Sequence, residues 1–233
     1  MQHEFKKLRQ ASSWPIVLLG IQWLVKIIET VWQYNWYTYG IYPRSVAGLK
    51  GIALAPFLHG DWIHLFDNSI PFLFLGTMLF YFYRHIAAET LLWIWFMGGL
   101  WTWIMARSSF HVGSSHIIYG LAAFIFFSGV FRKNLQLMSL SLLMVALYGG
   151  LIWGLLPVVE HISWEGHLMG AISGIWCAFY FKNYQTEIEK IVPQLIDDID
   201  DNDPYWLEGY EPKPKEPEKP VEVVYHYKES EKK

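Results

Sequence analysis

Polar residues stand at the beginnings of three long apolar stretches, where polar groups are costly to place in a membrane and therefore suggest a function. Ser115 begins one stretch, His167 is the second residue of another, and His64 and Asn68 lie in the first turns of a third. A serine hydroxyl becomes a nucleophile when a neighbouring base takes its proton, and a neutral histidine can be that base. These residues therefore predict acyl transfer by a Ser–His dyad, with Ser115 as nucleophile and His167 as general base.

The oxyanion of a tetrahedral intermediate needs hydrogen-bond donors, and three candidates are at hand. Asn68 offers a side-chain amide, His64 an imidazole N–H, and Ser115 its own backbone N–H. The spacing of four residues puts His64 and Asn68 on one helix face. No acidic residue is well placed as a third member, because Glu165 lies two positions before His167 and points to another side of a helix.

Helices of membrane length are expected to position these residues. Each apolar run is near the roughly 20 residues that cross a bilayer, and none alternates in the manner of a barrel strand. The sequence therefore predicts an all-α membrane protein with six transmembrane helices. Their expected ranges are 14–32, 62–83, 90–105, 115–131, 135–158 and 166–181.

The order of the helices predicts that the candidate residues share one depth in the membrane. With a cytoplasmic N-terminus, the second, fourth and sixth helices all enter from the outer face, and at ~1.5 Å per residue the four residues fall within roughly 10 Å of it. Gly166, Gly170 and Gly174 repeat every four residues, which predicts a smooth stripe against another helix. The expected partner is the fourth helix, near Gly113 and Gly120.

Three motifs, in this order, resemble those of the rhomboid family of intramembrane serine proteases. Residues 59–68 end in the family's His-x-x-x-Asn spacing, residues 113–116 follow its Gly-x-Ser-x pattern, and residues 166–170 are similar to its Ala-His-x-x-Gly motif. The resemblance covers about residues 55–182. It implies a six-helix, rhomboid-like bundle.

The resemblance also implies an intramembrane serine endopeptidase that cleaves single-pass transmembrane proteins near the outer membrane face. It assigns the nucleophile, the base and the oxyanion donors to the same four residues as the chemistry above. Tyr119 matches the family's aromatic residue that packs on the catalytic histidine, and Gly113, Gly170 and Gly174 are expected to support the site. The expected partners are the lipid bilayer and the substrate, with no nucleic acid, no metal and no cofactor.

One residue departs from the family pattern. Active members usually carry Gly after the nucleophile, whereas this chain has His116. An alternative is therefore a proteolytically inactive relative that binds membrane proteins without cutting them. A metal or proton transporter using His59, His64 and His167 is a further alternative. Such a transporter is expected to have carboxylates in mid-membrane, where the predicted helices have almost none.

We expect His111 and His116 at the membrane interface, with His116 facing away from the dyad.

Charge divides the chain into an apolar body and an acidic tail. Residues 1–182 hold 7 acidic and 11 basic residues, a net of +4, whereas residues 183–233 hold 14 acidic residues and 7 lysines, a net of −7. The tail is rich in proline and cannot bury a core, so we expect it to be disordered. The expected organisation is a cytoplasmic N-terminus at 1–13, the membrane domain at 14–182 and a charged, Pro-rich cytoplasmic tail at 183–233.

Lysine and arginine residues predict the orientation. Eight lie in predicted cytoplasmic segments, against three in outer segments, Arg44, Lys50 and Arg107, in agreement with the positive-inside rule. We therefore expect a multi-pass protein of the bacterial inner (cytoplasmic) membrane with both termini in the cytoplasm. Within the first helix, Lys26 and Glu29 are expected to snorkel toward the far interface.

Overall fold

The protein is all-helical in the part of the chain that the structure describes. The structure, a computed structural model, describes residues 2–147, 153–157 and 162–184. These residues contain no β-strand, and a single antiparallel bridge joins Ile41 to His111. The predicted all-α class is therefore confirmed for them, whereas the predicted tail lies outside the described residues except for 183 and 184.

Most of the predicted helices are present, with differences at their ends. The α-helices are α1 (Gln2–Val31), α2 (Lys50–Leu54), α3 (Trp62–Phe82), α4 (Ala87–Met105), α5 (Ser115–Phe131), α6 (Leu135–Leu147) and α8 (Trp164–Tyr180). Three short 3-10 turns, Tyr37–Tyr39, Ala47–Leu49 and Ala55–Phe57, lie in the loop before α3. The predicted helix over 135–158 is too long, because residues 154–157 form turns. Helix α1 begins at Gln2, well before the apolar run that starts at residue 14, so the largely polar residues 2–13 are also helical.

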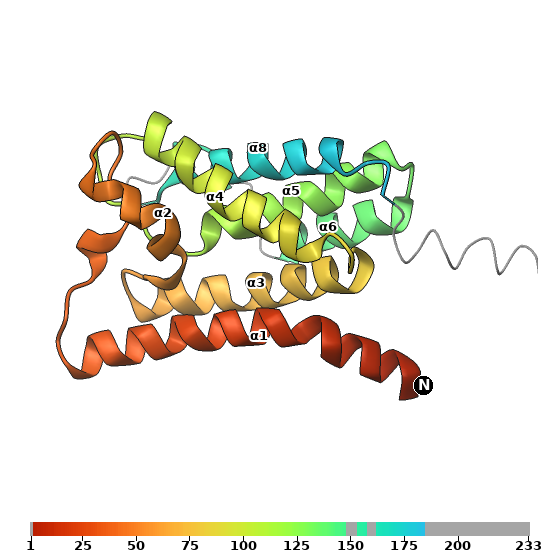
Figure 1. Ribbon diagram of the computed structural model, residues 1–233, viewed down its shortest axis with the longest axis horizontal. Helices are drawn as coiled ribbons and strands as arrows, with labels where there is room; N and C mark the ends of the chain where they lie inside the picture. Colours follow the sequence, from red (N-terminus) through yellow and green to blue (C-terminus); the bar gives the residue numbers. More distant parts are fainter. Residues whose placement is uncertain (1, 148–152, 158–161, 185–233) are drawn as a thin grey trace, which may run out of the picture. The chain divides into compact units, whose positions relative to one another are not determined.

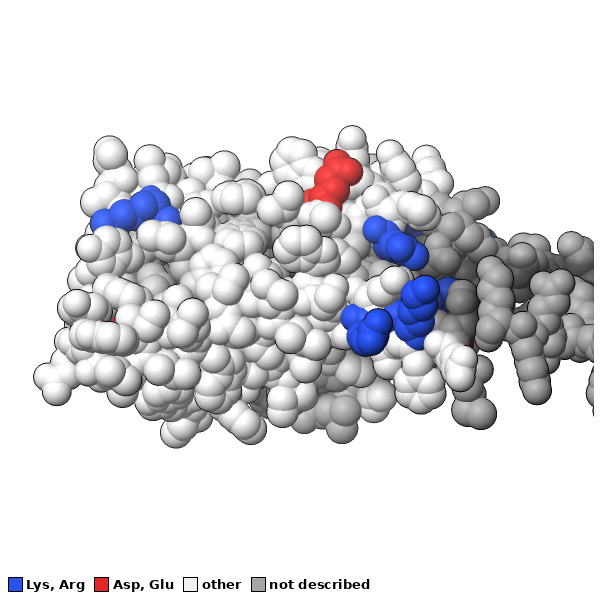
Figure 2. All heavy atoms as spheres, turned by 60° about the horizontal axis from the view of Figure 1, so that its bottom comes forward, with Lys and Arg blue, Asp and Glu red and all other residues white. Residues whose placement is uncertain are grey.

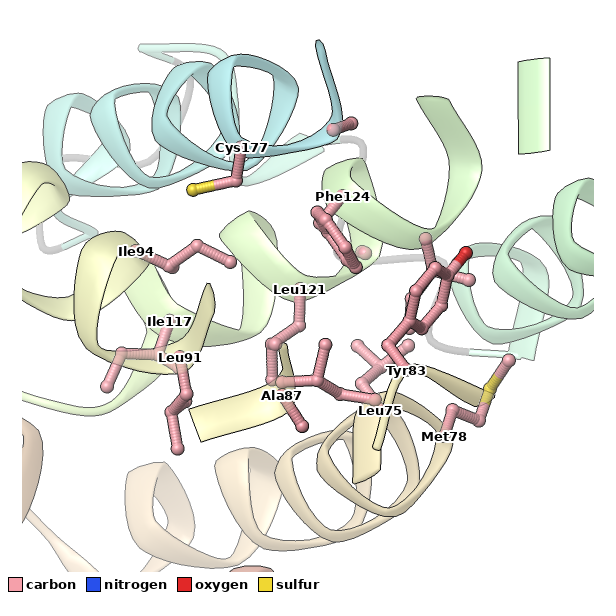
Figure 3. Packing of buried hydrophobic residues seen from close by; sticks show 14 of the residues in the cluster. Leu75, Met78, Tyr83, Ala87, Leu91, Ile94, Ile117, Leu121, Phe124 and Cys177 are labelled. Atoms are coloured by element: carbon pink, nitrogen blue, oxygen red, sulfur yellow. The ribbon is translucent and has the colours of Figure 1, made fainter. Parts of the chain in front are cut away.

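Helix α5 is the centre of the bundle. It makes its most extensive contact with α8 and also packs against α3, α4 and α6, while α1 lies along α3 (Figure 1). The core fills the space between these helices with side chains such as Leu75 of α3, Ile94 of α4, Phe124 of α5 and Cys177 of α8 (Figure 3). In lipid, such packing has to come from close van der Waals contact, because hydrocarbon tails are as apolar as the side chains.

Two of the described helices are long and apolar enough to cross a membrane by length and composition. They are the segment Glu4–Val31 within α1 and the whole of α3, and α5 is a shorter apolar helix. The count of six transmembrane helices therefore stays a prediction. Figure 2 shows lysine and arginine side chains toward the two ends of one face, and the surface between them is uncharged apart from an acidic side chain.

Candidate active site

A cavity of about 710 Å³ lies where α3, α5 and α8 begin. These three helices run in the same direction through the bundle, so their first turns meet at one end (Figure 1). The cavity brings together candidate residues that are far apart in the sequence. Those lining it are His64, Asn68, Ser115, Tyr119 and His167.

The first turns of α3 carry His64 and Asn68 into this cavity. Asp61 precedes the helix with an extended backbone, and its carboxylate accepts a hydrogen bond of 2.8 Å from the backbone N–H of His64. This is a helix N-cap, which fixes where α3 begins. Asn68 is buried, and its amide nitrogen Nδ2 has no hydrogen-bond partner among the described residues. A buried donor of this kind is costly to leave unpaired, so a group entering the cavity gains by accepting from it.

Gly113 lets the loop before α5 approach these two side chains. Its φ is +103°, a conformation that favours glycine, and its N–H donates to the carbonyl of Ala55 at 2.9 Å. A Cβ at this position would lie 2.7 Å from Nε2 of His64 and 3.3 Å from Nδ2 of Asn68. Any larger residue would therefore push the loop away from the two candidate oxyanion donors.

Ser115 is the first residue of α5 and lines the cavity. The first N–H groups of a helix have no acceptor within the helix and form its positive end, so the N–H of Ser115 is suited to an anionic oxygen. The neighbouring Ser114 is fully buried and donates instead to the side-chain oxygen of Gln22 on α1 at 3.2 Å. The sequence analysis did not single out Gln22; its amide within an apolar run was the available signal.

His167 lies in the first turn of α8 with a defined proton position. Its Nδ1 is 2.8 Å from the carbonyl oxygen of Gly154. A carbonyl can only accept, so Nδ1 carries the hydrogen and Nε2 presents its lone pair. The ring of Tyr119 stacks on the imidazole, with centroids 4.2 Å apart and planes at 11°. Among the described residues no hydrogen bond joins Ser115 to His167, and such bonds are often long before substrate binds.

Two glycines of α8 bring it against α5. A Cβ on Gly170 would lie 2.0 Å from the carbonyl oxygen of His116, and one on Gly174 would lie 2.0 Å from that of Gly120. The expected contact between these two helices is therefore present at both positions. Gly166 is not part of it, because its nearest neighbours are the side chains of Ser163 and Thr102.

Two other histidines were expected at the membrane interface, and both are buried inside the protein. His116 is 5% exposed, and its ring packs against Gly98 of α4. It does not line the cavity that holds Ser115 and His167, so it faces away from the two, as expected. His111 is also buried and does line that cavity.

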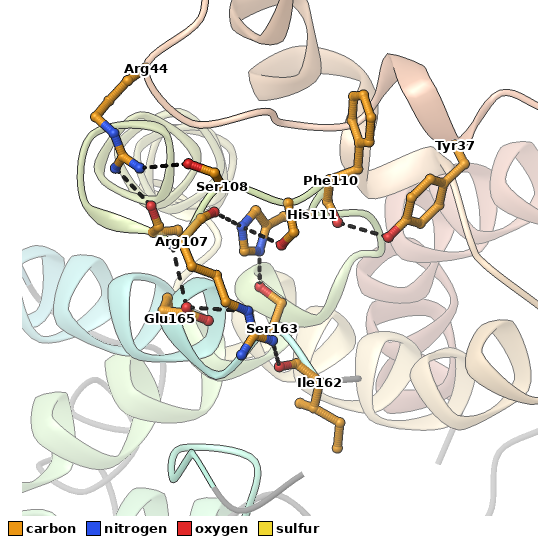
Figure 4. Close-up of polar contacts among 11 residues, drawn as sticks. Tyr37, Arg44, Arg107, Ser108, Phe110, His111, Ile162, Ser163 and Glu165 are labelled. Atoms are coloured by element: carbon orange, nitrogen blue, oxygen red, sulfur yellow. Dashed lines mark hydrogen bonds and ion pairs between the residues drawn. The ribbon is translucent and has the colours of Figure 1, made fainter. Parts of the chain in front are cut away.

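His111 joins the loop before α5 to the segment before α8. Its Nε2 donates to the carbonyl of Arg107 at 3.1 Å, which leaves Nδ1 as the acceptor for the hydroxyl of Ser163 (Figure 4). Burial lowers the pKa of the His111 imidazole, and the charge of Arg107 adds to this shift, whereas the hydrogen bond to the Arg107 carbonyl and the charge of Glu165 oppose it. The sequence analysis missed this pair, because nothing in the local pattern links residues 111 and 163.

Two arginines fix the same loops at the end of the bundle where the cavity lies. Arg107 forms an ion pair with Glu165 at 3.5 Å and donates to the carbonyl of Ile162 at 2.7 Å. Arg44 donates to the carbonyl of Ala106 at 2.7 Å (Figure 4). Glu165 is thus engaged away from His167, as expected from its helix position.

Lys26 and Glu29 do more than snorkel. Lys26 is 8% exposed, and its ammonium group pairs with Glu29 at 2.9 Å. The same group donates to the carbonyls of His59 at 2.9 Å and Gly60 at 3.2 Å. The pair therefore ties α1 to the loop that precedes α3 and its candidate residues.

Within the described parts of the chain, no group of three or more His, Cys, Asp or Glu side chains is arranged to hold a metal ion. The groups that line the cavity instead offer a hydroxyl, imidazole nitrogens and an amide. Together these can carry out nucleophilic attack, proton transfer and oxyanion binding.

Comparison with known proteins finds one protein family and several bacterial relatives. The model of the rhomboid domain matches residues 47–184. An uncharacterized protein of Mycobacterium tuberculosis is 32% identical over 175 residues, covering 70% of this chain and 72% of the relative, and one of Mycobacterium bovis matches to the same extent. An uncharacterized protein of Mycobacterium leprae is 34% identical over 178 residues, covering 70% of this chain and 68% of the relative.

The domain match includes every lining residue of the cavity except Tyr37, and with them the first turns of α3 and α5 and the histidine of α8. It covers more than half of the chain, and the relatives extend the similarity beyond isolated motifs. The chain therefore belongs to the rhomboid family of integral membrane proteins, whose members are generally intramembrane serine proteases.

Proposed function

We propose that the protein is an intramembrane serine endopeptidase that cleaves single-pass transmembrane proteins near the outer face of the membrane. Ser115 is the nucleophile, His167 the general base, and His64 with Asn68 stabilises the oxyanion. The observation that carries the proposal is the 2.8 Å contact between Nδ1 of His167 and the carbonyl oxygen of Gly154, from which the tautomer of the ring is inferred. The carbonyl of Gly154 holds the hydrogen on Nδ1, so the lone pair of Nε2 is available in the cavity that Ser115 lines.

The reaction follows from these groups. The Ser115 hydroxyl oxygen attacks the carbonyl carbon of the scissile peptide while its proton passes to Nε2 of His167. The imidazolium then gives that proton to the leaving amine, which releases the C-terminal fragment and leaves an acyl ester on Ser115. His167 next takes a proton from water while the water oxygen attacks the ester carbonyl. It returns that proton to the Ser115 oxygen as the ester bond breaks, which releases the N-terminal fragment as a carboxylic acid and restores the serine.

The polar surroundings support oxyanion binding. The amide of Asn68 is buried and unpartnered among the described residues, and the N–H of Ser115 stands at a helix N-terminus. Nε2 of His64 and Nδ2 of Asn68 both lie close to Gly113, so the two side chains are near each other. A backbone carbonyl of Gly154 stands where serine proteases with a triad use a carboxylate, which supports a dyad.

The decisive experiment is labelling of the full-length protein in detergent with a fluorophosphonate, which reacts with activated serines. We expect labelling of the wild type and none of Ser115→Ala. Ser114→Ala is the matched control, because the same atom is removed from the preceding residue, whose hydroxyl is bound to Gln22 outside the cavity. That variant is expected to be labelled.

Turnover of a model single-pass substrate gives a second readout. His167→Ala should lose nearly as much activity as Ser115→Ala, because the two residues act as a unit. Asn68→Ala should lose about 10- to 1000-fold, because one oxyanion donor of several is removed. Labelling or cleavage that persists in Ser115→Ala would refute the mechanism. A folded wild type that is neither labelled nor active would favour the inactive relative that binds membrane proteins.

A further inference from the structure

A second cavity, of about 350 Å³, lies between the N-terminal half of α1 and the C-terminal end of α3. It shares no lining residue with the candidate active site. Its lining combines cationic, aromatic and small side chains. These residues are Lys7, Gln10, Ala11, Ser13 and Trp14 of α1, Phe80 and Tyr81 of α3, and Arg84 and Ala88 beyond it.

The second cavity is lined by two charged side chains, Lys7 and Arg84, and both are cations. Lys7 is partly buried and lies 3.6 Å from Glu4, which also accepts a hydrogen bond of 2.6 Å from the hydroxyl of Tyr81. Glu4 thus offsets part of the charge of Lys7 without lining the cavity. Arg84 is exposed, so its guanidinium can reach an anion at the cavity mouth. A guanidinium fits phosphate oxygens with two hydrogen bonds, and an ammonium adds a point charge.

The rest of the lining suits hydrocarbon. Trp14 is 60% exposed, although its ring is large and apolar, and Phe80 is half-buried beside it in the cavity wall. Trp14 stands at the start of the apolar run of α1, shortly after basic residues, and this is the pattern found where a membrane meets water. An apolar wall adjoining two cations matches a molecule with an anionic head and an apolar chain, and inorganic phosphate would use the cations alone.

We propose that this cavity binds an anionic glycerophospholipid. Its phosphate lies between Lys7 and Arg84, and the upper part of an acyl chain lies along Trp14 and Phe80. The lipid then bridges α1 to the end of α3. Basic residues near a membrane surface attract anionic lipids in general, and here the cavity adds a defined place for one of them. The proposal is independent of the proposed protease activity.

The test is native mass spectrometry of the full-length protein, released from micelles that contain equal amounts of phosphatidylglycerol and phosphatidylcholine. We expect the wild type to retain one phosphatidylglycerol in preference. The double variant Lys7→Gln/Arg84→Gln should lose about tenfold of that preference, because two basic contacts to the phosphate are removed. The matched control is Lys6→Gln/Arg9→Gln. It also removes one lysine and one arginine, both from exposed positions in the N-terminal part of α1 that do not line the cavity.

The outcomes separate a site from a general attraction. An equal loss of preference in both double variants, or no loss in either, would overturn the proposal. Binding of inorganic phosphate that displaces phosphatidylglycerol at similar concentrations would show an anion site without a lipid. If the glutamine variant fails to fold, Lys7→Arg/Arg84→Lys, which keeps both charges, should retain the lipid, whereas Trp14→Ala should weaken its retention.

Discussion

Two histidines lining the candidate active-site cavity each use one ring nitrogen to bind a backbone carbonyl, but only one of them leaves the other nitrogen available. His111 donates through Nε2 to Arg107, and its Nδ1 is occupied by the hydroxyl of Ser163. His167 donates through Nδ1 to Gly154, and its Nε2 makes no hydrogen bond to any residue that the structure describes. Hydrogen bonding alone therefore favours His167 over His111 as the base in the proposed mechanism.

The change His116→Gly tests the residue that departs from the family pattern. His116 packs between α4 and α8 and does not line the cavity, so we expect turnover by folded protein to stay at or above the wild-type rate. The free energy of unfolding of the variant should be lower by about 1–3 kcal/mol, because the void left by the imidazole and the presence of glycine within a helix both destabilise the folded protein. Removal of the buried Nε2, which has no partner among the described residues, offsets part of this loss.

The measurement is substrate cleavage at low temperature together with a thermal melt of the same sample. A rate that falls by about 100-fold while the protein remains folded would mean that His116 takes part in the chemistry. Removal of an oxyanion donor typically causes a loss of about that size. It would contradict the geometry described above, in which the ring lies outside the cavity.

At the scale of elements, glycine positions decide how closely the helices approach. Gly170 and Gly174 of α8 lie directly against backbone atoms of α5, so these two helices touch without side chains between them. This contact brings the first turn of α8, with His167, beside the first turn of α5, with Ser115. The precision of the candidate dyad thus depends on a helix crossing that tolerates no larger residue.

The change Gly174→Ala is expected to destabilise the protein by about 1–3 kcal/mol, because the added Cβ would overlap the carbonyl oxygen of Gly120 and force the helices apart. Gly20→Ala is the matched control. It is also within a helix, and nothing lies within 4 Å of its added Cβ. This control should be neutral or up to about 1 kcal/mol more stable, because alanine favours a helix over glycine. Thermal melting of both variants in the same detergent measures the difference, and equal effects would argue against close contact.

At the scale of the whole molecule, the candidate site lies at one end of the helices, and the basic residues Lys7 and Arg84 lie at the other end. The cavity with Ser115 lies at one end, where Arg44 and Arg107 hold the loops by binding backbone carbonyls and Glu165. The basic residues Lys7 and Arg84 lie at the opposite end of α1 and α3. This separation agrees with a protein whose site opens near one membrane face and most of whose basic residues, eight against three in the predicted topology, lie on the other.

The topology prediction follows from that distribution. A reporter enzyme fused after Lys233 should be active in the cytoplasm, and one inserted near Arg44 should be active outside it. The two fusions control for each other, because a reversed protein would reverse both signals. An external signal from the C-terminal fusion would contradict the prediction of six spans with both termini in the cytoplasm.

The sequence by itself was sufficient to predict the family, the helical class and the ends of two important helices. Helix α3 was expected over 62–83 and lies at Trp62–Phe82, and α5 was expected over 115–131 and lies at Ser115–Phe131. Apolar runs are local features of a sequence, so they can be found without knowledge of the tertiary structure. Helix ends without a sharp change of composition, as in residues 2–13 and 154–157, were assigned less well.

Only the tertiary structure decided which polar groups meet. The bond from His167 to Gly154, the pair of His111 with Ser163, and the bond from Ser114 to Gln22 join residues that are 13, 52 and 92 positions apart. Sequence periodicity describes which residues share a face of one helix, but it does not say which face of another helix lies opposite. The available proton acceptor on His167 and the buried position of His116 therefore depend on how the helices pack together.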